Sequence, residues 1–173
     1  AYADQPKTPI EGQAWGQSLL YSSGTTGRPK GVKKPMPAMP FPETDPVYDV
    51  RRVRYMFDED TVYLSPAPLY HAAPLAFTLN VLRYGGKVVV MEHYDSERAL
   101  ELIQGHQVTH SQWVPTMFVR MLKLPEEIRT RYELGSHRVA IHAAAPCPVA
   151  VKQQMIEWWG PVIVEYYAAS EGI

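Results

Sequence analysis

Apolar residues in this chain are arranged in two patterns, short continuous runs and helical stripes. The runs are rich in β-branched and aromatic residues, which is typical of buried strands. Residues 87–91, with the sequence KVVVM, are the clearest example, and a Tyr-Gly-Gly turn leads into them. The predicted strands are residues 17–21, 61–65, 87–91, 108–114, 138–143 and 162–166.

Helical spacing separates most of these runs. Residues 72–83 form an apolar segment that we expect to be helical. Asp95 is placed to cap the next helix, and Pro115 suits the first position of another. Three later helices have predicted buried stripes: Ala99, Leu102 and Ile103 in one; Met117, Phe118, Met121 and Leu122 in the second; Val151, Met155, Trp158 and Trp159 in the third.

Strands that alternate with helices predict an α/β fold, with a mostly parallel sheet and helices on both faces. Sheets of this kind bind ligands in the loops at the carboxyl ends of their strands. Four such loops contain residues suited to chemistry, namely residues 22–31, 66–74, 143–146 and 168–172. These four loops are therefore the candidate site.

Composition narrows the possible partners. The chain has 173 residues and a net charge of −1, which gives no electrostatic reason to expect nucleic acid as a partner. Its single cysteine, Cys147, excludes an intrachain disulfide and fits a cytoplasmic location. No apolar run approaches the roughly 20 residues of a membrane-spanning helix, so we expect no transmembrane segment, while peripheral membrane association stays open. The proline-rich residues 33–46 are interpreted as a long surface loop.

The loop SSGTTGRPKG, residues 22–31, resembles a phosphate cradle. Its glycines allow backbone N–H groups to approach an anion, its hydroxyls donate hydrogen bonds, and Lys30 adds a cation. Pro29 stands where the P-loop pattern of nucleotide triphosphatases requires glycine, so that class is disfavoured. Taken alone, the loop is interpreted equally well as a flexible surface turn. Its candidate residues are Ser22, Ser23, Gly24, Thr25, Thr26, Gly27, Lys30 and Gly31.

The other three loops are individually ambiguous. His71 follows a predicted strand between prolines, and it could be a general base, a gate, a ligand contact or a plain structural residue. Glu171 and Ser170 suit Mg²⁺ held jointly with phosphate oxygens, but Glu171 could equally be a solvated charge. Tyr166 and Tyr167 alternate, so one should pack on the sheet while the other faces a ligand. The small residues of 143–146 fit either a planar ring or close packing of two elements.

Together and in this order, the motifs resemble those of the AMP-forming adenylating enzymes, the superfamily of acyl-CoA synthetases, adenylation domains and luciferase. The resemblance lies in SSGTTGRPKG, PLYH (residues 68–71), AAAP (residues 143–146) and EYYAASEG (residues 165–172). Within the superfamily the chain looks most like a fatty-acyl-CoA ligase. This resemblance implies ATP-dependent activation of a carboxylic acid as an acyl-adenylate and transfer of the acyl group to CoA, with Mg²⁺ as cofactor.

The resemblance also implies residue roles. Lys30 and its loop would hold the β- and γ-phosphates, His71 would line the junction of the acyl pocket and the CoA channel, and Glu171 would bind Mg²⁺. These three are the candidate catalytic residues. The remaining nucleotide contacts would be Ala144, Ala145, Pro146, Glu165, Tyr166, Tyr167, Ala168 and Ser170, with Tyr167 stacked on adenine.

Two departures qualify the resemblance. Ala168 and Ser170 replace the glycine and threonine that are usual in the last motif. The family's chains are also several times longer, so residues 1–173 are interpreted as part of an AMP-binding domain that lacks its upstream portion and the C-terminal domain with the catalytic lysine. We expect this part to be inactive alone and to self-associate through exposed core surface. Alternatives are adenylation that feeds a carrier protein, and a non-catalytic nucleotide-binding module.

Overall fold

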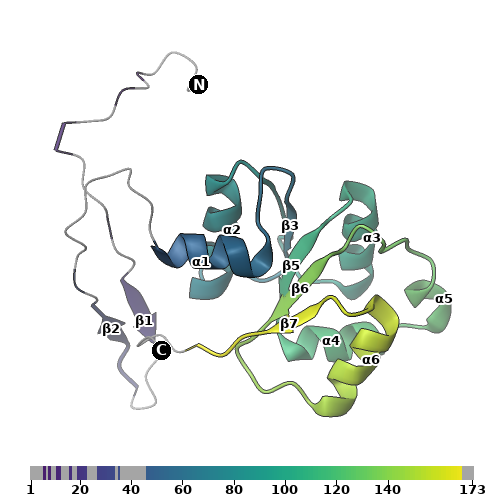
Figure 1. Ribbon diagram of the computed structural model, residues 1–173. Coiled ribbons are helices and arrows are strands. Elements are labelled where there is room, and N and C mark those ends of the chain that lie inside the picture. The colour runs from purple at the N-terminus through teal and green to yellow at the C-terminus, as the bar shows by residue number, and fades with distance from the viewer. Residues whose placement is uncertain are drawn as a thin grey trace. The chain divides into compact units, whose positions relative to one another are not determined.

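The computed structural model describes residues 46–168 continuously and, before them, residues 6, 8, 11, 12, 16, 19–22, 27–33 and 35 (Figure 1). The chain divides into two compact units near Pro46. The first contains a small hairpin, and the second is a layered α/β unit. Each unit is described by itself.

The α/β unit is built on a sheet of five parallel strands. Their spatial order is β4 (Lys87–Val90), β3 (Val62–Ser65), β5 (His110–Trp113), β6 (Val139–His142) and β7 (Ile163–Glu165). Each of these strands lies inside a segment that the sequence pattern predicts. The prediction of a mostly parallel sheet is confirmed.

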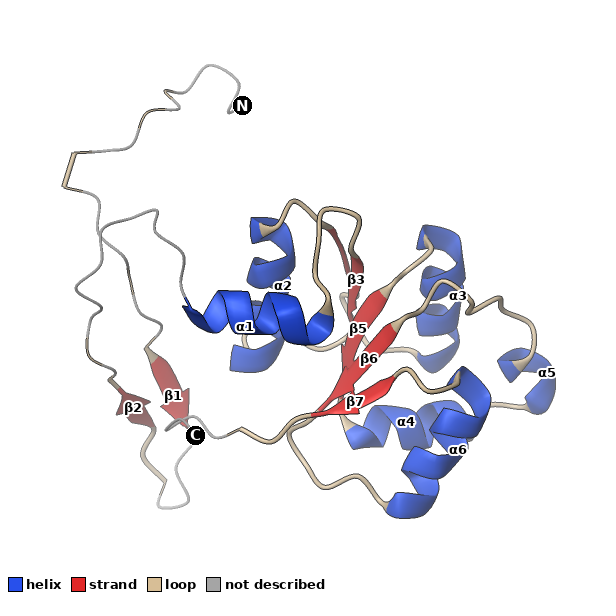
Figure 2. Cartoon of the chain, viewed as in Figure 1, coloured by secondary structure: helices blue, strands red, loops and turns tan. Residues whose placement is uncertain are grey.

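Helices cover both faces of this sheet, as predicted (Figure 2). Helices α1 (Pro46–Tyr55) and α2 (Ala72–Arg83) lie on one face. The opposite face carries α3 (Ser96–His106), α4 (Pro115–Leu122) and α6 (Val149–Trp159), with the short α5 (Glu126–Arg129) beyond them. No helix in the described ranges is long and apolar enough to cross a membrane.

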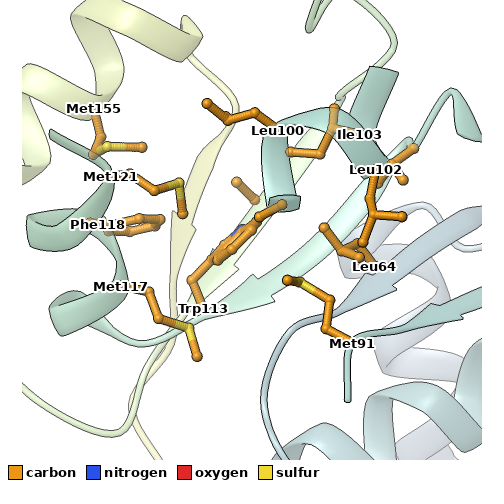
Figure 3. Packing of buried hydrophobic residues seen from close by; sticks show 13 residues of the cluster. Leu64, Met91, Leu100, Leu102, Ile103, Trp113, Met117, Phe118, Met121 and Met155 are labelled. Atoms are coloured by element: carbon orange, nitrogen blue, oxygen red, sulfur yellow. The ribbon is translucent and has the colours of Figure 1, made fainter. Parts of the chain in front are cut away.

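The larger core lies under α3, α4 and α6, and its centre is the indole of Trp113. Figure 3 shows side chains of α3 and α4 converging on this ring. The rings of Phe118 and Trp159 lie 6.2 and 5.4 Å from it, centroid to centroid. The predicted helical stripes supply much of this core: Ala99, Leu102, Ile103, Met117, Phe118, Met121 and Met155 are all buried.

The smaller core, on the opposite face, is aromatic. Tyr55 and Phe57 pack with Phe77 of α2, at centroid distances of 5.3 and 6.2 Å. Arg51 places its guanidinium 5.5 Å from the centre of the Phe77 ring, a cation–π contact that covers this core from outside. The outward side of α2 is also apolar, since Leu75, Leu79 and Leu82 are exposed.

Local sequence signals predict several helix boundaries correctly. The Asp95 carboxylate accepts the Arg98 N–H at 2.8 Å and caps α3, as predicted. Pro115 is the first residue of α4, where its missing N–H costs no helical hydrogen bond. Residues 72–83 form α2 with the predicted bounds.

One prediction near the N-terminal side is wrong, and one helix there was not predicted. The predicted buried strand at residues 17–21 is instead β1 (Leu20–Ser22), paired antiparallel with β2 (Lys30–Val32) in a hairpin. Leu19 and Tyr21 are exposed there, and among the described residues no second layer covers the hairpin. Most of the predicted loop at residues 33–46 lies outside the described residues, and Pro46, its last residue, begins α1, a helix that was not predicted.

The strand order reverses direction at β3. The chain passes outward from β3 to β4 and then returns to the other side of β3 to form β5. Loops that leave β3 and β5 therefore run in opposite directions, and in open parallel sheets a ligand crevice ordinarily forms at such a reversal. The fold thus selects this edge of the sheet as the place for a ligand.

A histidine is buried where the sheet meets the larger core. The side chains of His137 and Ser111 are hydrogen-bonded at 2.6 Å, and Trp113 donates its indole N–H to the same serine oxygen. His137 Nδ1 has no partner, and the ring lies 5.0 Å from that of Trp159. Burial, with a smaller contribution from His110, lowers the pKa of His137 to about 3, so the imidazole is neutral in the folded chain.

We predict that acid destabilises the fold through this histidine. The unfolded chain binds a proton near pH 6.5 and the folded chain near pH 3, so stability is full above pH 6.5 and falls as the pH is lowered. The His137 contribution to the free energy of unfolding should fall by about 2 kcal/mol between pH 7 and pH 5. Urea denaturation at pH 7 and pH 5 should show that the free energy of unfolding falls less for His137→Gln than for the wild-type protein. An equal pH dependence in both proteins would contradict the prediction.

Candidate functional site

Four loops of the α/β unit leave the carboxyl ends of neighbouring parallel strands. They follow β3, β5, β6 and β7, and all four ends lie at one edge of the sheet. Because adjacent parallel strands end side by side, three of the predicted motifs share this edge: PLYH after β3, AAAP after β6 and EYYA after β7.

His71 caps the N-terminus of α2 with its backbone. Its carbonyl accepts the Leu75 N–H at 3.2 Å, while its imidazole makes no capping hydrogen bond. The ring lies 4.5 Å from that of Tyr70, and both side chains are exposed. His71 is thus held by its backbone just beyond the carboxyl end of β3, and its exposed ring contacts that of Tyr70.

The loop after β6 contains a strained residue. Ala143 is buried at the end of the strand, and Ala144 follows with φ of 76°. In this left-handed region a Cβ crowds the following carbonyl, which is why glycine is the usual residue. Ala144 turns the chain sharply outward, so that Ala145 and Pro146 are exposed beside the end of β7.

The two tyrosines after β7 have different environments. Tyr166 is half-buried: its hydroxyl accepts a hydrogen bond from Gln112 Nε2 at 3.1 Å, and its ring lies 5.7 Å from that of Phe77. Burial raises the pKa of the Tyr166 hydroxyl, so it stays neutral. Tyr167 is 87% exposed. The alternation therefore places Tyr166 in the core and leaves Tyr167 open to a ligand.

Glu165 ends β7 as part of a charged cluster. Its carboxylate pairs with the ammonium of Lys152 from α6, and this hydrogen bond is the main cause of a lowered pKa at Glu165. His142 Nδ1 lies 4.0 Å from the other carboxylate oxygen. Burial lowers the pKa of His142, whose ring is fully enclosed and has no hydrogen-bond partner on either nitrogen.

Part of the predicted phosphate loop lies in the hairpin unit. Ser22 pairs with Lys30 across the two strands, and Gly31 lies opposite Tyr21. A Cβ at Gly31 would come within 3.3 Å of the Tyr21 ring, so a side chain there would force the ring to shift. Gly27 has φ of 86°, a conformation that favours glycine.

Several predicted site residues lie outside the described ranges. These are Ser23, Gly24, Thr25 and Thr26 in the phosphate loop, and Ser170 and Glu171 in the last motif. The proposed Mg²⁺ ligand is therefore one of them. Within the described ranges, no group of three His, Cys, Asp or Glu residues is arranged to hold a metal ion.

Sequence reasoning missed three residues at this edge: Gln112, His142 and Lys152. Gln112 and His142 are polar residues inside strands that are buried on both faces, which was an available signal. Lys152 gave no comparable signal, because a lysine on a helix is ordinarily a solvated charge.

Comparisons with known proteins agree with this geometry. The family model described as AMP-binding enzyme matches residues 14–173. The chain is 36% identical over 141 residues to 4-coumarate-CoA ligase 1 of Narcissus pseudonarcissus, which covers 81% of this chain and 25% of the relative. It is 29% identical over 153 residues to the medium/long-chain-fatty-acid–CoA ligase FadD8 of Mycobacterium tuberculosis, covering 88% of this chain and 25% of the relative.

The fold is also similar to solved structures. ATP-bound MatB from Rhodopseudomonas palustris superposes with a TM-score of 0.71 at 27% identity, over 87% of this chain and 28% of that protein. The chain thus spans about a quarter of the length of the curated relatives that it matches.

We predict that Ala144→Gly stabilises the chain by about 0.5–1 kcal/mol. Glycine removes the 1–2 kcal/mol cost of a left-handed alanine, which is only partly offset by greater freedom of the unfolded chain. Ala145→Gly is the matched control: its backbone is not left-handed, so it should lose about 0.5–1 kcal/mol. Urea denaturation measures the free energy of unfolding of both variants. An equal decrease in the two would contradict backbone strain at Ala144.

Proposed function

This chain belongs to the AMP-binding enzyme family, and from that premise we propose that the intact protein activates a carboxylic acid with ATP and transfers it to CoA. The acid would form an acyl-adenylate with release of pyrophosphate, and the thiol of CoA would then displace AMP. The observation that carries the proposal is the gathering of three motif loops at the carboxyl edge of one parallel sheet. Both curated relatives above are named CoA ligases.

The residues fit the demands of this reaction. Attack of a carboxylate on a triphosphate requires charge neutralisation and positioning more than covalent help. Lys30 and the backbone N–H groups of its loop would bind the β- and γ-phosphates. Mg²⁺, held by Glu171, would supply further neutralisation of the phosphate charge when bound. Ser170 would donate to the α-phosphate.

The base-binding surface would be formed by the loops after β6 and β7. Ala144, Ala145 and Pro146 have small or flat side chains and are exposed, so a planar ring can approach their backbone. Tyr167 would stack on the ring from the adjacent loop. Ala168 adds a methyl group where the family usually has glycine, and we propose that adenine sits slightly displaced there. His71 would line the passage between acid and CoA.

The acid is proposed to have an apolar body. One relative is named for 4-coumarate, an aryl propenoate, and the other for medium- and long-chain fatty acids. We propose a fatty acid as the substrate and an aryl propenoate as its competitor. A carrier protein is the alternative acceptor to CoA. The location proposed for the reaction is the cytoplasm.

We predict that the intact protein releases pyrophosphate from ATP·Mg²⁺ when supplied with an acid from a panel of alkyl and aryl carboxylates. Free CoA should then yield an acyl-CoA, detectable by mass spectrometry. Tyr167→Ala should raise the KM for ATP about three- to tenfold, the loss of one aromatic stacking contact. Val53→Ala, which truncates an exposed side chain of α1, should leave that KM unchanged. Absence of pyrophosphate with every acid would favour a non-catalytic nucleotide-binding module.

Residues 1–173 alone are predicted to release no pyrophosphate and to self-associate. We propose that the intact protein contains further segments. Among them would be a C-terminal domain with the catalytic lysine that the reaction requires. The exposed leucines of α2 support self-association, because exposed apolar residues gathered on one helix face ordinarily mark a contact surface. Sedimentation should give a mass above one chain, which Leu75→Glu with Leu79→Glu should reduce. Activity of residues 1–173 alone would contradict this proposal.

A further inference from the structure

In the charged cluster at the end of β7, the position of Lys152 is not explained by the stability of its own helix, α6. Lys152 is in the opening turns of α6, whose first turn contains no acidic residue. A cation near a helix N-terminus opposes the helix dipole, so Lys152 is placed unfavourably within its own helix. An interaction from outside the helix can offset this cost.

That interaction is the contact with Glu165. The ammonium of Lys152 pairs with one carboxylate oxygen of Glu165, across the connection from α6 to β7. The side chains are 30% and 42% exposed, so neither charge is fully desolvated. Among the described residues His142 also faces this carboxylate, at 4.0 Å, but it is a weak partner because burial keeps its ring neutral.

Glu165 is the point at which β7 leaves the sheet. The next residue, Tyr166, donates its backbone N–H to the His142 carbonyl at 3.2 Å, and its hydroxyl is bonded to Gln112. Beyond it, Tyr167 and Ala168 are exposed, and no strand pairing includes them. The direction of these two residues therefore depends on how firmly the residues before them are held.

We propose that Lys152 is a positioning residue for nucleotide binding, which acts by pinning Glu165 and so fixes the exit of β7 toward Tyr167. The inference rests on the proposed function, in which Tyr167 stacks on adenine. Gln112 and Phe77 hold the core side of this exit through Tyr166, and Lys152 holds its outer side through Glu165. Lys152 itself need not touch the nucleotide.

The experiment uses Lys152→Met, which keeps the aliphatic length and removes the charge, and Lys152→Arg, which keeps the charge. In the ligand-free intact protein, hydrogen exchange of the Tyr166 amide should be roughly two- to fivefold faster in Lys152→Met, the range that a half-exposed ion pair supports. The dissociation constant of AMP, measured by calorimetry, should rise by up to the same factor. Lys152→Arg should leave both the Tyr166 exchange rate and the AMP dissociation constant at their wild-type values.

Arg131→Met is the matched control. It breaks another ion pair between separate segments, Arg131 with Glu97 at 2.9 Å, whose side chains are 54% and 41% exposed. It should change neither the Tyr166 exchange rate nor the AMP affinity. If Lys152→Met leaves either quantity at the wild-type value, or if Arg131→Met changes both equally, the positioning role is overturned.

The exchange measurement also separates this inference from the proposed function. If the wild-type protein neither binds AMP nor releases pyrophosphate, the proposed function fails, and with it the link from Lys152 to the nucleotide. Exchange that is faster in Lys152→Met but normal in Lys152→Arg would still establish that the ion pair pins β7.

Discussion

Parallel pairing of β3, β5 and β6 is the constraint on which the rest of this unit depends. Parallel strands cannot be joined by tight turns, so each connection must cross a face of the sheet, and the crossing helices bury both faces. The same pairing places every strand's carboxyl end at one edge. Loops far apart in the sequence, such as those after β3 and β7, therefore meet a common edge without any direct signal between them.

Burial on both faces also explains the unusual polar residues of the sheet. Tyr63 donates to Gln112 at 3.4 Å, and Gln112 donates to Tyr166, so a hydrogen-bonded chain crosses the sheet to the exit of β7. Such buried polar groups are costly unless they are paired, and pairing gives them a fixed geometry. The tyrosine next to the candidate base-binding surface is thus held from within the core.

Local chemistry made much of this fold predictable. Asp95, Pro115 and the apolar stripe of α4 act within a few residues of chain, and each predicted its element correctly. Helix α1 escaped prediction because its stability comes from contacts outside the helix: Tyr55 enters an aromatic core, and Arg51 lies over Phe77. The ion pair of Lys152 with Glu165 escaped for a similar reason, since it depends on how α6 crosses the sheet. Motif order indicated the family, whereas the contacts that hold the motifs in place had only an indirect signal, the polar residues Gln112 and His142 inside buried strands.

The position of β4 has a consequence for handling the protein. Within the described ranges β4 is an outer strand of the sheet, with the sequence KVVV, and Val90 at its end is half exposed. An outer strand of β-branched residues presents unpaired backbone groups to any other extended chain, and charges are the usual protection against such pairing. Lys87 is the charge that β4 carries, and it lies at the opposite end from Val90. Because none of the described residues pairs with this edge, concentrated preparations of residues 1–173 are open to strand-to-strand aggregation there, and Val90 is the position where an added charge would oppose it.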